Sequence, residues 1–210
     1  MGRYIGPVCR LCRRERCKLY LKGARCYSSK CPVDRKLILP GQHGPKQGLR
    51  GKMTDYNTHL REKQKVKRMY GVFENAFEKY FDKAKAQREI PTGEKLMELL
   101  ERRLDNVVYR ASMSTSRTLA RQFVNHGHIV VNGKRLDVAS YQVRPGDVIE
   151  VKESARNIGM IADSIKSPLT PPSWLSLDSK NFKVEVLRVP TMSDIDINAN
   201  VQLIVEFYSR

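Results

Sequence analysis

All five cysteines of this chain lie between positions 9 and 31, in a segment with too few apolar residues to form a core of its own. Cys9 and Cys12 are separated by two residues, and Cys26 and Cys31 by four. Two closely spaced pairs joined by a loop are typical of a tetrahedral thiolate site, because each short turn aims two sulfurs at one ion. The segment therefore predicts a small metal-bound knob whose folding free energy comes largely from the metal.

The spacing leaves the identity of the metal open. Zinc is the default ion for four thiolates, and an iron–sulfur cluster on the same four cysteines is the alternative. Five ordinary reduced cysteines are the remaining interpretation. Four protein ligands leave no open coordination position, so we expect a structural site. The flanking arginines and lysines are expected to favour thiolates over thiols. Cys17 belongs to neither pair and is interpreted as a spare thiol.

Positive charge is concentrated at the same end of the chain. The 210 residues carry a net charge of +17. Residues 1–52 hold 14 basic and 2 acidic residues, a net of +12, whereas residues 153–210 have a net of −1. A surplus of this size repels itself in a compact protein and favours a polyanionic partner. Nucleic acid is the first candidate and an anionic membrane surface the second. We expect the last quarter to pack or to contact protein.

Membrane insertion and export are not expected. No apolar run approaches the ~18 residues that a membrane-spanning helix needs, and the first residues contain no apolar signal core. No helix pattern here pairs a basic face with a strong Trp and Leu face, so a membrane-surface role is also disfavoured. The sequence predicts a cytoplasmic protein.

The middle of the chain reads as a basic loop followed by helices. Residues 32–53 are rich in turn-forming residues. A helix capped by Thr54 or Asp55 is expected to reach Gly71, and because its apolar stripe is thin, we expect part of its surface to face RNA. Aromatic residues at helical spacing over 73–84 predict a helix that faces the core.

The second half combines helices with strands. Residues 92–108 predict one helix, and the next helix carries Arg117 and Arg121 on a shared outward face. Asn132-Gly133 is a strong hairpin signal between short strands. Further along, a helix is expected over 155–166. Later strands are expected at 141–143, 148–151, 174–178, 182–189 and 203–208.

These patterns predict an α+β chain. It consists of an N-terminal metal-bound knob, a helical domain and a small domain of two helices plus a small twisted sheet, which the resemblance given below implies is an inserted small RNA-binding domain. The expected boundaries are 1–52 for the basic segment with the knob and loop, 53–93 for the helical domain, 94–152 for the small RNA-binding domain, and 153–210 for a packing and protein-contact region that joins 53–93 in space.

No pattern of catalytic residues is found. The chain has no nucleotide-binding Gly-rich loop and no nucleophile elbow. His126 and His128 flank Gly127 and are interpreted as groups near a phosphate or in turn packing, because a catalytic base needs a partner and a pocket. Asp105 is interpreted as the partner of an ion pair that orients an arginine. We therefore expect a protein that is not an enzyme and has no small-molecule substrate.

Several motifs in the second half resemble a known RNA-binding domain. RRLDNVVYR at 102–110, the His126-Gly127-His128 turn and VNG at 131–133 are similar to the small domain named after ribosomal protein S4. That domain also occurs in pseudouridine synthases, some tRNA synthetases and heat-shock RNA-binding proteins. Only 58 residues follow position 152, which is too few for a separate catalytic domain.

The rest of the chain extends the resemblance over nearly its whole length. MGRYIGP at 1–7, PGQHG at 40–44, LREKQK at 60–65 and LIVEFYSR at 203–210 are similar to the bacterial ribosomal protein S4 (uS4) family. The paired cysteines resemble those of its cysteine-bearing, metal-binding branch. A metal-containing DNA-binding regulator, which the cysteine spacing alone would suit, explains neither the basic loop nor the small-domain motif.

The resemblance implies a structural constituent of the small ribosomal subunit in the cytoplasm. It implies primary binding to 16S rRNA at the five-way junction of the 5′ domain, where the protein nucleates assembly of the subunit body. It also implies contact with ribosomal protein S5, an influence on translational accuracy, and a place beside mRNA at the entry channel. Several family members repress their own operon by binding mRNA.

Charge and resemblance together give a set of candidate RNA-binding side chains on the knob, the loop, the helix after it and the small domain. They are Arg3, Tyr4, Arg10, Arg13, Arg14, Lys22, Gln42, His43, Lys46, Arg50, Lys52, Arg61, Lys63, Lys65, Lys67, Arg68, Arg102, Arg117, Arg121, Gln122, His126 and His128.

Overall fold

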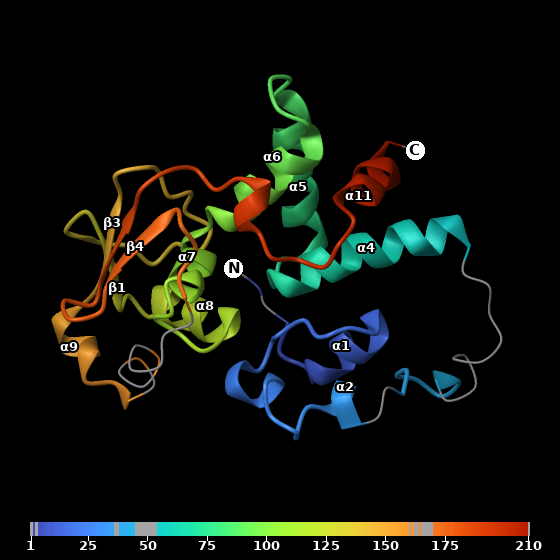
Figure 1. Cartoon of the computed structure of the whole chain (residues 1–210), viewed down its shortest axis with the longest axis horizontal. Helices are drawn as coiled ribbons and strands as arrows, with labels where there is room; N and C mark the ends of the chain where they lie inside the picture. Colours follow the sequence, from blue (N-terminus) through green and yellow to red (C-terminus); the bar gives the residue numbers. More distant parts are fainter. Residues whose placement is uncertain are drawn as a thin grey trace. The chain divides into compact units, whose positions relative to one another are not determined.

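The computed structural model describes residues 2, 4–35, 38–44, 54–159, 161, 164 and 170–209. The chain divides into two compact units, which are treated separately below (Figure 1). The first unit comprises Met1–Gly93 together with Ile197–Arg210, and the second comprises Glu94–Asp196.

The first unit is built from helices. Its elements are α1 (Cys9–Glu15), η1 (Gly23–Cys26), α2 (Pro32–Arg35), α4 (Asp55–Met69), α5 (Glu74–Ala86) and α11 (Val201–Tyr208).

The two central helices of this unit follow the sequence pattern. The Thr54 hydroxyl accepts a hydrogen bond from the Asn57 N–H at 3.3 Å, as expected of the residue that caps α4. In α5 the expected core residues Phe77 and Phe81 are buried, and so are Tyr80 and Ala84. Phe73 is the exception, because it precedes α5 in extended backbone and is 49% exposed.

The C-terminal segment was expected to be a strand, and this prediction was wrong. Val201–Tyr208 forms helix α11, which begins where the Asn200 side chain accepts a hydrogen bond from the Gln202 N–H at 3.0 Å. Figure 1 shows α11 alongside α4, and the Tyr208 ring stacks on Phe81 with the centroids 4.4 Å apart. A short apolar run is compatible with either a strand or a buried helix. Packing against α4 and α5 favours the helix here.

A polar cluster fastens α4, α5 and α11 together. The Glu74 carboxylate accepts hydrogen bonds from the ammonium groups of Lys63 and Lys67, each at 2.6 Å, and from the Tyr208 hydroxyl at 3.0 Å. The Lys63 ammonium also lies 4.4 Å from the centroid of the Phe207 ring. Burial opposes ionisation of Glu74, but the two lysines lower its pKa to about 2.

The second unit combines helices with an antiparallel sheet. Its elements are α6 (Thr92–Glu101), which begins at the boundary between the units, α7 (Leu104–Arg110), α8 (Arg117–Asn125), β1 (Ile129–Val131), β2 (Lys134–Arg135), β3 (Val148–Val151), α9 (Glu153–Arg156), β4 (Leu175–Asp178), β5 (Lys183–Val186) and η2 (Met192–Asp194).

The sheet has the strand order β2-β1-β3-β5-β4, with antiparallel pairing throughout. The predicted hairpin is confirmed: Val131 pairs with Lys134, and both turn residues, Asn132 and Gly133, have positive φ. One face of the sheet packs with α7 and α8 into a shared hydrophobic core, in which Trp174 is fully buried.

The helix expected over 92–108 is interrupted at Arg103. This residue has extended backbone with ψ of 135° and ends α6 before α7 begins. The interruption pairs with the segment expected as strand 141–143: the Arg102 carbonyl accepts from the Val143 N–H and the Tyr141 carbonyl from the Leu104 N–H, both at 2.9 Å. Hydrogen bonds to a distant segment thus replace those of a continuous helix.

The structure also divides the last quarter of the chain differently from the expected boundaries. Only Ile197–Arg210 joins the first unit. Residues 153–196 belong to the second unit, because β4 and β5 extend its sheet through the pairing of β5 with β3. Of the helix expected over 155–166, the structure describes α9 and a few later residues, and the others lie outside the described part.

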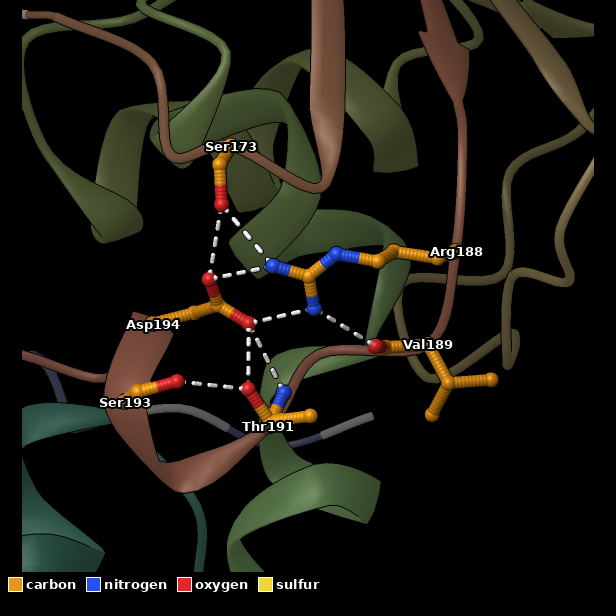
Figure 2. A network of polar contacts seen from close by, with 6 residues as sticks. All are labelled: Ser173, Arg188, Val189, Thr191, Ser193 and Asp194. Carbon is orange, nitrogen blue, oxygen red and sulfur yellow. Dashed lines mark hydrogen bonds and ion pairs between the residues drawn. The ribbon is translucent and has the colours of Figure 1, made fainter.

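A side-chain clamp fixes the segment that follows β5. Figure 2 shows the Arg188 guanidinium bridging Asp194 and Ser173, with two bonds of 2.7 Å to the carboxylate and one of 2.8 Å to the hydroxyl. Asp194 also accepts from the Thr191 N–H at 2.9 Å. The Arg188 contact and these hydrogen bonds hold the pKa of Asp194 well below its usual range, although burial opposes them.

The Glu74 cluster predicts a loss of stability in acid. Because the pKa of Glu74 falls from 4.5 to about 2 on folding, its contribution is present above pH 4.5 and is lost as the pH falls toward 2. Glu74→Gln should therefore unfold in less urea than wild type at neutral pH, and the difference should shrink near pH 3. Glu89→Gln, which changes an exposed carboxylate, is the control. A pH-independent difference would contradict the assigned role of Glu74.

Candidate RNA-binding surface

The knob presents cations to solvent. Arg10 and Arg14 on α1 are exposed, and so is Lys22 in the turn before η1. Within the described residues, none of these three side chains has a carboxylate within ion-pair distance. Arg13 differs, because it is half-buried and donates a hydrogen bond to the Ile38 carbonyl at 3.3 Å. The unpaired cations are available to phosphates.

The candidates that flank the knob are exposed where the structure describes them. Tyr4, Gln42 and His43 all lie at the surface of the first unit. The remaining candidates in this part of the chain lie outside the described residues, namely Arg3, Lys46, Arg50 and Lys52.

The basic side chains of α4 are engaged inside the protein. Lys63 was expected to face RNA, and this prediction was wrong. Its side chain is only 5% exposed because it pairs with the Glu74 carboxylate. Lys67 contacts the same carboxylate, and Lys65 contacts Glu62 at 2.6 Å. The polar faces of α4 form ion pairs within the protein. The thin apolar stripe in the sequence does not distinguish such ion pairs from a surface that faces RNA.

The two arginines of α4 contact α1. Arg61 and Arg68 both donate to Oε1 of Glu15, Arg61 at 3.2 Å. The Glu15 carboxylate is buried, and its Oε2 has no hydrogen-bond partner among the described residues. Burial raises the pKa of Glu15, and the two arginines oppose that increase.

Asp105 pairs with an arginine, as predicted from the sequence. The Arg103 guanidinium donates to both carboxylate oxygens of Asp105, at 3.0 and 2.6 Å, and both residues are buried. Arg121 lies 3.8 Å from the same carboxylate and is only 6% exposed. The expected outward face shared with Arg117 is therefore wrong for Arg121, because the buried carboxylate draws it inward.

Arg117 and Arg102 are half-buried and also make contacts within the second unit. The Arg117 Nε donates to the Asn106 side chain at 2.7 Å, and its guanidinium lies 4.5 Å from the centroid of the Tyr109 ring. Arg102 donates to the Val143 carbonyl at 2.9 Å and pairs with Glu98 at 2.8 Å. Their charge positions helices as well as contributing to the field at the surface.

A second group of candidate side chains lies where α8 leads into β1. Gln122 is half-buried on α8, His126 is exposed just after it, and His128 is half-buried at the start of the sheet. The two imidazole centroids are 5.9 Å apart. Among the described residues, this group, the knob and His43 are places where sequence candidates keep exposed, protonatable or cationic side chains.

Several exposed cations were not among the candidates. They are Arg16, Arg25, Lys30 and Arg35 in the first unit and Lys134, Arg135, Arg144 and Lys152 in the second. They lie in or beside short elements, and Lys134 and Arg135 together form β2. The turn-forming residues next to them in the sequence could have identified them, because residues at tight turns lie at the surface.

The paired cysteines lie close to one another without converging. Cys12, Cys26 and Cys31 are buried, and Cys9 is half-buried. The Lys22 N–H donates to Cys26 Sγ at 3.3 Å. In the part of the chain that the structure describes, no three His, Cys, Asp or Glu side chains are grouped closely enough to hold a metal as they stand.

Burial favours the protonated form of two of these thiols. It raises the pKa of Cys12 to about 11, with the neighbouring Cys26 and Cys9 adding to the effect and the Leu19 N–H opposing it. Burial likewise raises the pKa of Cys26. The flanking cations do not overcome burial at these two sulfurs, contrary to expectation. Cys17 packs with the apolar residues around Met69.

Comparison with known proteins accounts for both units. Residues 3–101 match the ribosomal protein S4/S9 N-terminal domain, and residues 102–149 match the S4 domain. The chain is 53% identical to small ribosomal subunit protein uS4 of Natranaerobius thermophilus and 52% identical to that of Thermus thermophilus, in each case across the whole of both chains. The chain belongs to the uS4 family.

Membership in the uS4 family confirms two predictions. The relatives are named as ribosomal proteins, a structural family, so this uS4-family chain is not an enzyme. The S4 domain within the second unit implies binding to rRNA. Among the described residues, no helix has both the length and the apolar character needed to cross a membrane.

The buried carboxylate of Asp105 predicts a large effect on stability. Asp105→Asn removes the negative charge that Arg103 and Arg121 share, so we expect the free energy of unfolding in urea to fall by about 3 kcal/mol. Asp137→Asn, which changes an exposed carboxylate of the same unit, should alter it by less than about 0.5 kcal/mol. Equal effects of the two substitutions would contradict the structural role of the Asp105 pair.

Proposed function

We propose that this chain is a primary rRNA-binding protein of the small ribosomal subunit, acting in the cytoplasm without catalysis. It binds the five-way junction of the 16S rRNA 5′ domain and nucleates assembly of the subunit body. The observation that carries the proposal is the set of exposed cations on the knob, including Arg10, Arg14 and Lys22, that have no carboxylate partner in the described part of a uS4-family chain.

The mechanism follows from charge and shape. The deep major groove of double-stranded RNA is closed to side chains, so a protein recognises phosphates, 2′-hydroxyls and the geometry of helices. Cations on separate elements can contact several RNA helices at once, and a junction offers several helices within reach. The knob carries such cations, and so do Arg135 and Lys152 near the turn between α8 and β1. The ion pairs of α4 hold the helices of the first unit together.

We further propose contact with ribosomal protein S5 and a position beside the mRNA entry channel, through which the chain influences accuracy. Exposed apolar side chains of the second unit, Leu187, Val189 and Met192, support a protein contact near the Arg188–Asp194 clamp. Repression of its own operon through mRNA binding belongs to the same proposal. Binding of S5 to the reconstituted rRNA complex tests the S5 contact, and binding of operon mRNA to the protein tests the proposed repression. Absence of binding would exclude the corresponding proposal.

The binding mode predicts strong dependence on salt. If 6–10 phosphates are contacted, affinity for a 16S rRNA 5′-domain fragment should fall roughly 10³–10⁵-fold between 50 and 200 mM salt. Arg10→Ala combined with Arg14→Ala removes two exposed cations and should reduce the slope of log affinity against log salt by about 1–2. Filter binding across a salt series measures the slope.

Lys79→Ala combined with Lys83→Ala is the matched control, because it also removes two exposed cations of the first unit but from α5. It should leave the slope close to that of wild type. An unchanged slope in the Arg10 and Arg14 variant, or an equal reduction in both variants, would contradict the assignment of the knob as the RNA contact.

We also propose that Cys9, Cys12, Cys26 and Cys31 hold a structural metal, zinc or an iron–sulfur cluster. The donor chemistry fits: four thiols lie in one short segment of the chain, three of them are buried, and the Lys22 N–H donates a hydrogen bond to Cys26 Sγ. The side chains must turn toward a common centre to ligate an ion. A bound metal favours thiolates and so opposes the effect of burial on Cys12 and Cys26.

Metal content gives the direct test. The protein is purified without oxygen, and its elemental content and visible spectrum are measured together. One zinc in a colourless sample, or iron with sulfide and brown absorption, is the expected result. Cys12→Ser should lose the metal, and Cys17→Ser should keep it because Cys17 packs against α4 and belongs to neither pair. Wild type without metal would contradict the proposal.

A further inference from the structure

Four protonatable or cationic side chains meet where α8 enters the sheet. His126 lies in the turn after α8, and His128 immediately precedes β1. Arg135 ends β2, and Lys152 follows β3. The backbone fixes this arrangement, because Lys152 lies opposite His128 in the antiparallel ladder and its N–H donates to the His128 carbonyl at 2.9 Å. Three separate segments therefore contribute to one small area.

Gly127 is the residue that lets Arg135 approach. It has φ of +72°, and a Cβ built at this position would lie 2.2 Å from Nε of Arg135 and 2.6 Å from its Cζ. The guanidinium thus crosses the turn in the space that any side chain at 127 would occupy. This close approach brings the Arg135 guanidinium to the turn between the two histidines, where its positive charge opposes protonation of His128.

The charges of this area are not neutralised within the protein. Among the described residues, none of the four side chains forms an ion pair. Glu150 occupies the same face of the sheet two residues before Lys152, but its carboxylate pairs with Lys183 at 3.3 Å. The Phe123 ring meets His128 edge-on, with the centroids 6.3 Å apart. His128 is thus bordered by an apolar ring and by positive groups.

This environment disfavours a charged His128. Burial lowers its pKa, and His126, Lys152 and Arg135 lower it further. The imidazole is therefore mostly neutral at neutral pH. An anion placed among the four side chains reverses the balance, because a nearby negative charge favours the protonated ring. Binding of an anion and uptake of a proton from solvent are then coupled.

We propose that His126, His128, Arg135 and Lys152 form a phosphodiester-binding subsite for RNA, and that a phosphate bound there is accompanied by proton uptake at His128. The inference rests on the proposed rRNA-binding function and adds a location and a pH dependence to it. Arg135 and Lys152 supply permanent charge, and the imidazoles supply N–H donors. The neutral ring of the free protein limits the repulsion that the cluster would otherwise create.

The test compares binding of the full chain to a 16S rRNA 5′-domain fragment at several pH values and fixed salt. Wild-type affinity should rise as the pH falls from about 8 to about 6, by at most about tenfold per pH unit, the limit for one proton. His128→Gln should flatten this dependence, whereas His59→Gln, which changes a histidine of the first unit that contacts Glu206 and is not an RNA-binding candidate, should leave it unchanged. The reverse pattern would overturn the proposal.

Charge substitutions test the phosphate contact separately. Arg135→Ala should reduce the salt slope by about 1, and Lys180→Ala, an exposed cation in the β4–β5 turn, should not. NMR titration of the His128 ring in the wild-type chain avoids any folding defect of the variants. Its midpoint should move to higher pH when the RNA fragment is added, and an unmoved midpoint would overturn the proposal.

The outcomes separate this inference from the function on which it rests. Salt-dependent, junction-specific binding that is indifferent to His128→Gln and Arg135→Ala would remove the subsite and leave the rRNA-binding function intact. Binding to the junction fragment no tighter than to duplex DNA of equal length would instead count against the rRNA-binding function itself.

Discussion

Two carboxylates, Glu15 and Glu74, organise the first unit, because they contact four of the five lysines and arginines on α4. A helix this basic would repel itself and its basic surroundings if those charges were left unpaired. Glu15 brings α1 to one part of the helix, and Glu74 brings α5 and the Tyr208 end of α11 to another. Desolvation makes such pairs costly unless both partners stay in place, so they specify how the helices meet.

The same pairing decides which cations remain for RNA. In the second unit, Asp105 pairs with Arg103 and Arg121. The cations near the turn after α8 have no carboxylate partner in the described part of the chain. In the first unit, the knob keeps Arg10 and Arg14 exposed. The net charge of +17 thus separates into charges that hold helices and charges that face solvent. A family of rRNA-binding proteins needs both, since phosphate contacts are useful only when their geometry is fixed.

Local patterns predicted the elements that depend on local chemistry. The cap of α4, the hairpin at Asn132-Gly133 and the core face of α5 all followed from residues near in sequence. The predictions failed where distant segments decide. Hydrogen bonds from 141–143 interrupt the helix at Arg103, and packing on α4 and α5 turns Val201–Tyr208 into a helix. The strands β4 and β5 were expected, but not their addition to the sheet of the second unit.

The sequence by itself determined the family, the RNA-binding class and the regions where basic residues gather, because motif spacing and net charge are properties of the chain alone. Only the tertiary structure decided which basic residues are free. Lys63 and Arg121 looked no different from Arg10 in the sequence, yet they are buried against carboxylates contributed by other elements. Likewise, the cluster around His128 requires Gly127 and the β1–β3 register to bring Arg135 and Lys152 together, since no spacing along the chain encodes that contact.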